Sequence, residues 1–139
     1  MDYSLALRRA VLKALKANAG VVAIIPAGSL YPTVVPTART FPFGRYGAPQ
    51  TTPFRLSGLS ASSHRFTYHA FVNSLPTRTA EDRAYDVANS IQEALEGRNL
   101  PLEGGMHATV SWLGSNCLID RDEPTNWHAV INFAADVAG

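Results

Sequence analysis

The sequence predicts an α+β domain, in which a mainly antiparallel sheet of four to five strands carries two helices on one face, in the order α-β-β-α-β-β. Two observations predict this class. Apolar residues recur at helical spacing near the start of the chain and again over residues 79–97, whereas the segments on both sides of the second helix alternate with a period of two. Helices on one face of an antiparallel sheet bury both kinds of apolar surface together. We therefore expect residues 1–139 to form a single domain.

Residues 3–19 form the first predicted helix, and Gly20 is expected to end it. One side of this helix is an apolar stripe, and the other side is basic. The basic residues are Arg8, Arg9, Lys13 and Lys16. Basic amphipathic helices can bind nucleic acid or a membrane surface. Because only four charges are present and no aromatic residue lies among them, a solvated face or a subunit contact is the favoured interpretation.

Residues 26–63 contain most of the nine prolines, together with many Gly, Ser and Thr residues. This composition predicts loop and extended chain after a short apolar run over residues 21–25. Short strands over 30–35 and 41–48 are expected at edge positions, because proline or glycine interrupts each of them. Residues 50–63 are expected to be an exposed, mobile loop.

Residues 64–73 alternate regularly and predict a central strand. The second helix follows, with Thr79 as its cap and Gly97 just past its end. Two further strands, at 106–119 and 127–135, form a closing hairpin with a bend at Gly114. Trp112 and Trp127 are expected on its inner face.

The net charge of +1 conceals an uneven distribution. Residues 1–78 carry nine Lys or Arg and one acid, a net charge of +8, whereas residues 79–139 carry three Arg and ten acids, a net charge of −7. Two interpretations stay open. The halves neutralise each other within one subunit, or they form basic and acidic faces that associate head to tail, as ring subunits do.

No combination of residues predicts chemistry at a site. The four histidines lack metal-ligand spacing, and the single cysteine, Cys117, has no partner cysteine and no activating neighbour in the sequence. We expect no catalytic residue, no metal and no cofactor. No apolar run approaches the ~20 residues of a membrane helix, and the basic start is amphipathic, unlike a signal peptide.

Four segments carry a likeness to a known family: LALRRAVLKALKANAGVVAII with the following LYPTVVP, HRFTYHAFVNS, AEDRAYDVANSIQEALEGRNLPLEG, and SWLGSNCLIDRDEPTNWHAVINFAA. In these segments the chain resembles the tail-completion, or tail-terminator, family of long-tailed bacteriophages and gene-transfer particles. They look like that family's opening helix, central strand, second helix and closing hairpin. The stretch FPFGRYGAPQTTPFRLSGLSAS departs from the pattern.

The resemblance implies a structural virion protein of the tail or neck, assembled in the cytoplasm of a bacterial host, and not an enzyme. It implies a homo-hexameric ring that caps the head-proximal end of the tail tube and joins it to the head connector. The implied partners are the tail tube protein and a head-completion or connector protein, with DNA passing through the lumen without specific binding. The alternatives are another neck component or, further away, a small cytoplasmic ligand-binding or enzyme domain.

Ten charged or polar residues are the expected contacts with neighbouring subunits or partners: Arg8, Arg9, Lys13, Lys16, Arg45, Arg55, His69, Asp120, Asp122 and Glu123. We expect the lumen to be neutral or acidic, because several basic side chains on duplex DNA would hold it tightly. This expectation rests on the near-zero total charge and on the absence of an aromatic–basic surface from the sequence pattern.

Overall fold

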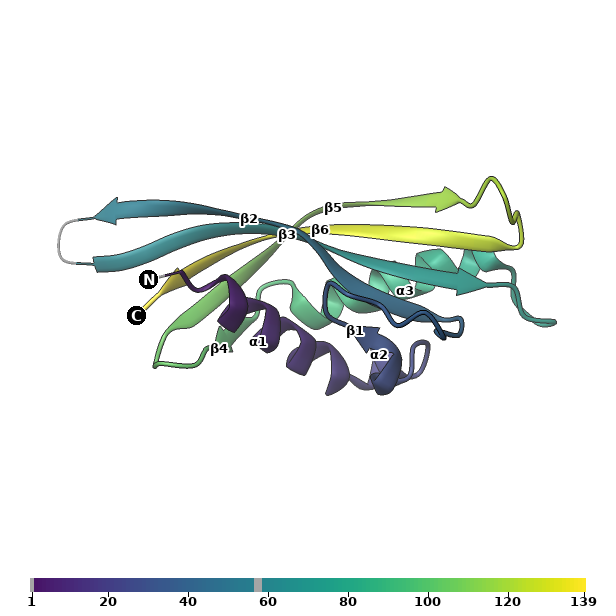
Figure 1. Cartoon of the computed structure of the whole chain (residues 1–139), viewed down its shortest axis with the longest axis horizontal. Coiled ribbons are helices and arrows are strands. Elements are labelled where there is room, and N and C mark those ends of the chain that lie inside the picture. The colour runs from purple at the N-terminus through teal and green to yellow at the C-terminus, as the bar shows by residue number, and fades with distance from the viewer. Residues whose placement is uncertain (1, 57–58) are drawn as a thin grey trace.

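A computed structural model describes residues 2–56 and 59–139, with side chains except those of residue 48 and residues 53–60. A six-stranded sheet carries all the described α-helices on one face and leaves its other face open (Figure 1). The elements in chain order are α1 (Ser4–Lys16), α2 (Ala19–Val22), the short 3₁₀ helix η1 (Ala27–Ser29), β1 (Leu30–Tyr31), β2 (Phe43–Leu56), β3 (Leu59–Asn73), α3 (Ala80–Leu95), β4 (Asn99–Pro101), β5 (His107–Ile119) and β6 (Asn126–Ala138).

The predicted α+β class is confirmed, but the predicted sheet is wrong in detail. The strands lie in the order β1-β2-β3-β6-β5-β4, and β1 pairs with β2 in parallel, so the sheet is mixed and has six strands. The two strands at its ends, β1 and β4, span two and three residues. Strand β1 lies within the predicted edge strand over 30–35 but is shorter, whereas the three residues of β4 are too few to show alternation and fall in no predicted strand.

The first predicted helix is divided into two. Helix α1 ends at Lys16, and Asn18 begins α2 by accepting a hydrogen bond on its side-chain oxygen from the N–H of Val21, at 3.0 Å. Gly20 therefore lies inside α2 and does not end the first helix, contrary to the sequence expectation. Asparagine is a strong N-cap residue, and it competes here with continuation of α1. The described helices include none that is long and apolar enough to cross a membrane.

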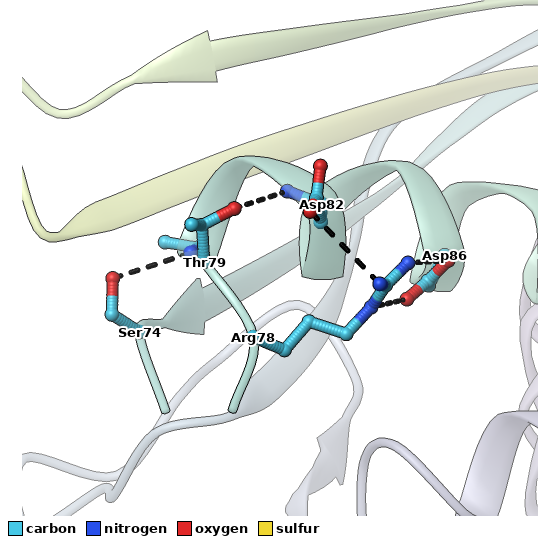
Figure 2. A network of polar contacts seen from close by, with 6 residues as sticks. Ser74, Arg78, Thr79, Asp82 and Asp86 are labelled. Atoms are coloured by element: carbon cyan, nitrogen blue, oxygen red, sulfur yellow. Dashed lines mark hydrogen bonds and ion pairs between the residues drawn. The ribbon is translucent and has the colours of Figure 1, made fainter. Parts of the chain in front are cut away.

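Helix α3 begins as the sequence predicts. The Thr79 hydroxyl accepts a hydrogen bond from the N–H of Asp82 at 3.2 Å, and the Ser74 hydroxyl accepts one from the N–H of Ala80. Figure 2 shows how Arg78 lies alongside this first turn and pairs with Asp86 and Asp82. Acidic side chains at a helix N-terminus are favourable, and these exposed pairs add little beyond that.

The core lies between α3, α1 and the covered face of the sheet. Its largest fully buried side chains come from every layer: Tyr46, Tyr68, Phe66, Phe133, Leu7, Leu15, Ile25, Leu30, Ile91, Leu95, Ile131 and Val11. Helix α3 packs mainly on β6, with β3 and β5 on either side. The predicted period-two alternation of β3 and β6 thus supplies the sheet side of the core, and the predicted apolar stripe of α3 supplies the helix side.

The predicted loop over residues 50–63 is wrong as secondary structure. Within the described residues, β2 and β3 stay paired from Gln50 with Arg65 out to Leu56 with Leu59. These strand ends reach past the helices as an arm (Figure 1). Proline is tolerated on a strand whose other edge is uncovered, so Pro49 and Pro53 do not stop β2. Arg55 lies in this arm, and its side chain is outside the described part of the chain.

Candidate functional site

The open face of the sheet carries an aromatic ladder that crosses three strands. Phe43 of β2, Phe71 of β3 and His128 of β6 are neighbours in the sheet register. The Phe43 and Phe71 rings stack at a centroid distance of 4.7 Å, and Phe71 and His128 stack at 4.2 Å. Alternation puts these three side chains opposite the core, because their strand neighbours face the helices. The ladder therefore lies on the side of the sheet away from the helices, where Phe71 and His128 are partly exposed and Phe43 is buried, at 4% exposed.

Two arginines lie over this ladder. The Arg39 guanidinium carbon is 5.3 Å from the Phe43 ring centroid, and that of Arg45 is 6.0 Å from the Phe71 ring centroid. Contacts of this kind are worth about 0.5–1 kcal/mol at exposed sites. A cavity of about 420 Å³ opens beside the two arginines, and Asp120 also lines it. The expectation that the chain has no aromatic–basic surface is thus wrong, since the strands bring together rings and charges that are far apart in sequence.

A chain of hydrogen bonds continues the open face beside the ladder. The Thr67 hydroxyl donates to the carbonyl of Gly47 at 3.0 Å, so it must accept from Nε2–H of His69, which lies 3.0 Å away. Neutral His69 then has a lone pair on Nδ1, and Nε2–H of His128 donates to it at 2.8 Å. Both rings have a defined tautomer as a result. Gly47 is required, because a Cβ there would lie 2.8 Å from the His69 ring.

The two histidines are held neutral. Burial, the charge of Arg45 and the neighbouring His128 lower the pKa of His69 to about 4. Burial and Arg45 also lower the pKa of His128. At neutral pH the positive charge of this face therefore comes from arginine alone, and the histidines contribute flat, hydrogen-bonded surface.

The second candidate surface is one edge of the sheet. Four of the large exposed apolar side chains come from the outer half of β5: Trp112, Leu113, Leu118 and Ile119. Trp112 was expected in the core, but it is exposed, and its indole N–H donates to the Ser115 hydroxyl at 3.0 Å. Trp112 stands opposite the buried Phe133 in the register, directly before the shift between Trp112 and Gly114, and is still 36% exposed. Gly114 has φ 144°, which favours glycine, and the predicted bend is confirmed.

The ten expected contact residues fall into separate places. Arg45, His69 and Asp120 come together on the open face or its cavity. Asp122 and Glu123 lie in the exposed turn between β5 and β6, where their N–H groups donate to the Asp120 carboxylate. The four basic residues of α1 lie in the helical layer, away from the open face. The expected contact residues do not include Arg39, Phe43, Phe71 or His128. The one sequence signal for part of this surface is the outward position of His69, Phe71 and His128 in alternating strands.

The charge asymmetry is partly neutralised inside the subunit. Within the described residues, three ion pairs form: Arg9 with Glu103, and Arg78 with both Asp82 and Asp86. Each joins a basic residue of the first half to an acid of the second. Arg39, Arg45, Lys13 and Lys16 form no ion pair in the described part of the molecule. Part of the charge is therefore neutralised within the subunit, and part is left for contact between subunits, so both interpretations stay open.

Cys117 has the character of a packed thiol. Burial and the nearby charge of Glu81 raise its pKa, which keeps it protonated and a poor nucleophile. Among the described residues, no group of three potential metal-ligating side chains converges. What the molecule offers is surface: an aromatic–basic face and an apolar strand edge.

Comparisons with known proteins agree with this description. A family model described as "Tail completion protein gp17" matches residues 9–138. A chain in the virion of a native gene transfer agent particle has the same fold, with a TM-score of 0.80 at 19% identity over 96% of both chains. The bacteriophage SPP1 gp17 protein is similar with a TM-score of 0.62 at 19% identity, over 95% of this chain and 88% of that one. No curated protein sequence matches the chain.

Proposed function

Because the chain belongs to the family of the tail completion protein gp17, we propose that it assembles as a homo-hexameric ring on the head-proximal end of a tail tube. Membership makes it a structural component of a phage or gene-transfer-particle virion and not an enzyme. In the proposal, the ring stops growth of the tube and supplies the surface on which the head connector docks. The family match over residues 9–138 is the observation that carries it.

The two candidate surfaces support this role. A subunit that worked alone would leave the aromatic–basic face and the outer half of β5 in water. Exposed apolar patches flanked by polar groups are typical of interaction sites. A ring subunit has four neighbours to meet: two copies of itself, the tube below and the connector above. We assign the edge of β5 to contact between copies. We assign the open face, with Arg45, His69 and Asp120, to contact with the neighbouring copies, the tube or the connector.

The remaining expected residues belong to the same proposal. The unpaired lysines of α1, Lys13 and Lys16, are exposed in the helical layer. The turn bearing Asp122 and Glu123 lies at the end of the β5–β6 hairpin. We propose that these opposite charges meet across subunit boundaries, with Arg8 and Arg9 beside them. DNA passes through the lumen without being gripped, and the aromatic–basic face is turned towards protein.

A joining assay tests the function directly. Particles made without this protein should yield filled heads and separate tails, with tubes of variable length, and adding the purified chain should restore joined particles. Leu118→Lys should fail to restore them, whereas Tyr85→Lys, an exposed position on α3, should restore them. Joined particles with tails of normal length in the complete absence of the protein would contradict the proposal.

A further inference from the structure

The two edges of the sheet are built differently. Strand β5 has β6 on one side along its whole length, but its other side is covered only near its start, by β4 and by Arg98, which accepts a hydrogen bond from the N–H of Val110 at 3.0 Å. From Ser111 to Ile119 the described chain places no strand there. All 13 residues of β5 lack a charged side chain of the Asp, Glu, Lys or Arg type.

An uncovered, uncharged, apolar strand edge is one that natural proteins normally protect. The opposite edge has such protection, since β2 contains Pro49 and Pro53, and proline has no N–H to offer a further strand. The outer half of β5 has neither proline nor charge, and Leu113, Leu118 and Ile119 each expose about half of their surface, at 51%, 52% and 50%. This edge is therefore shaped for a strand to add to it.

The backbone of β5 also supports strand addition at this edge. The N–H of Asp120 donates to the carbonyl of Asn126, across the turn to β6. Successive residues of an antiparallel strand direct their N–H and C=O groups to opposite sides. The amides of Ile119, Cys117 and Ser115 therefore point away from β6, towards the uncovered side. A partner that contacted only the side chains of β5 would leave these three N–H groups bonded to water. A partner strand would accept hydrogen bonds from them with its backbone carbonyls.

A matching segment lies at the other end of the sheet. Residues 33–35, Thr-Val-Val, begin one residue past the end of β1 and lie between Pro32 and Pro36. Thr33 and Val35 line the cavity on the open face, while Val34 points away with 81% of its surface exposed. Within the described chain, residues 32–36 take part in no backbone–backbone hydrogen bond. The segment is uncharged and β-branched, and it presents one apolar side chain outward.

We propose that the outer half of β5 in one copy receives residues 33–35 of the next copy as an added strand, so that the sheets of adjacent subunits are joined edge to edge. The two partners lie at opposite ends of the strand order, as a head-to-tail contact between identical subunits requires. Main-chain hydrogen bonds supply affinity, and Val34 packs on Leu118, which stands opposite His128 in the sheet register. This contact rests on the proposed ring and states which segments make it.

Cross-linking tests the contact in the full chain. In a Cys117→Ser background, a mixture of one variant carrying Val34→Cys and another carrying Leu118→Cys should form a disulfide-linked dimer of the two variants under mild oxidation. Each variant alone should give none. Replacing Val34→Cys by Tyr85→Cys is the matched control and should give none with Leu118→Cys. Assembled rings without the Val34–Leu118 cross-link would overturn the contact.

Charge substitutions give a second, independent test. Leu118→Lys and Val34→Glu each place a charge at the proposed contact, and each should raise the concentration needed for half-assembly about tenfold or more. Together in one chain they should restore much of the assembly, because lysine and glutamate then face each other. Both positions are exposed in the subunit, so melting temperatures should be unchanged. Failure of the double variant to recover any assembly, with both single variants impaired, would count against direct contact.

Hydrogen exchange resolved by residue distinguishes strand addition from side-chain packing. In assembled wild-type protein the amides of Ser115, Cys117 and Ile119 should exchange at least tenfold more slowly than in dissociated Leu118→Lys. The amide of Val110, already bonded to Arg98, is the internal control and should be protected in both. Equal exchange at the three amides in a six-copy ring would overturn the strand contact and leave the ring intact. A chain that stays monomeric at every concentration would overturn the proposed ring itself.

Discussion

The same three strands carry an aromatic ladder on each face of the sheet, and the two ladders differ in what surrounds them. On the covered face, Tyr46, Phe66 and Phe133 stack with centroid distances of 5.0 and 5.3 Å, and all three are buried under the helices. On the open face, Phe43, Phe71 and His128 stack just as closely, but two arginines and a histidine pair surround them. The first ladder holds the subunit together. In the second, Phe71 and His128 stay partly exposed to solvent in the single subunit.

The largest expected effect breaks the covered ladder. Phe133→Ala should lower the free energy of unfolding by about 3–5 kcal/mol, because it removes a fully buried ring and leaves a cavity. Chemical denaturation of the dissociated subunit measures this. Leu118→Ala on the open side is the control and should change the value by less than about 0.5 kcal/mol. Similar losses for both variants would contradict the division between the two faces.

Gly44 tests how tightly the covered face is packed. A Cβ at this position would lie 2.6 Å from the Tyr68 ring, which is fully buried and cannot withdraw. Gly44→Ala should therefore lower the free energy of unfolding by about 1–3 kcal/mol. Gly28→Ala has nothing within 4 Å of the new carbon and serves as the control. A neutral Gly44→Ala would show that Tyr68 has room to move.

A pH titration examines the open face. The pKa values of His69 and His128 are depressed in the folded chain, that of His69 to about 4, so the unfolded chain binds more protons below the ordinary histidine pKa of about 6.5. The free energy of unfolding should fall as pH is lowered through that window, by on the order of 1 kcal/mol once solvent screening is allowed for. His69→Gln should flatten the decline, because it removes the group whose pKa is lowered to about 4. A wild-type stability constant from pH 6.5 to 4 would contradict the assignment.

The smallest expected effect concerns charge between subunits. The Debye length falls to about 3 Å at 1 M salt, so contacts among exposed charges such as Lys13, Lys16 and Asp122 should weaken, while the apolar edge of β5 should not. Assembly at 1 M salt should be reduced several-fold but not abolished. Sedimentation across a salt series measures this, with Lys13→Gln and Lys16→Gln together expected to reduce the salt dependence. An oligomer unchanged from low salt to 1 M would remove charge as a contributor.

The sequence predicts the covered face far better than the open one. The period-two alternation of β3 and β6 and the stripe of α3 identify most of the core, because burial acts on each residue locally. The cap at Thr79 and the bend at Gly114 are also local, and both are confirmed. The Phe43–Phe71–His128 ladder depends on register between distant strands, which no local pattern reveals.

The errors have the same origin. The prolines, serines and threonines of residues 50–63 are typical of loops and predict one, yet pairing between residues 50–56 and 59–63 makes both segments strand. The short strands β1 and β4 exist because longer neighbours offer them free edges, not because of their own composition. Residues that depend on tertiary pairing, Arg39 and Arg45 over their rings among them, could be found only from the structure.

The mass of the assembled wild-type chain tests the central claim most directly, namely that the outer half of β5 is covered by another copy of the chain in a ring. Native mass spectrometry of the full chain at near-physiological salt should give a particle of about 90 kDa, six copies of a 15.0 kDa subunit. Leu118→Lys should shift that particle towards 15.0 kDa, while Tyr85→Lys should leave it intact. A wild-type chain that remains at 15.0 kDa at every concentration would contradict the account.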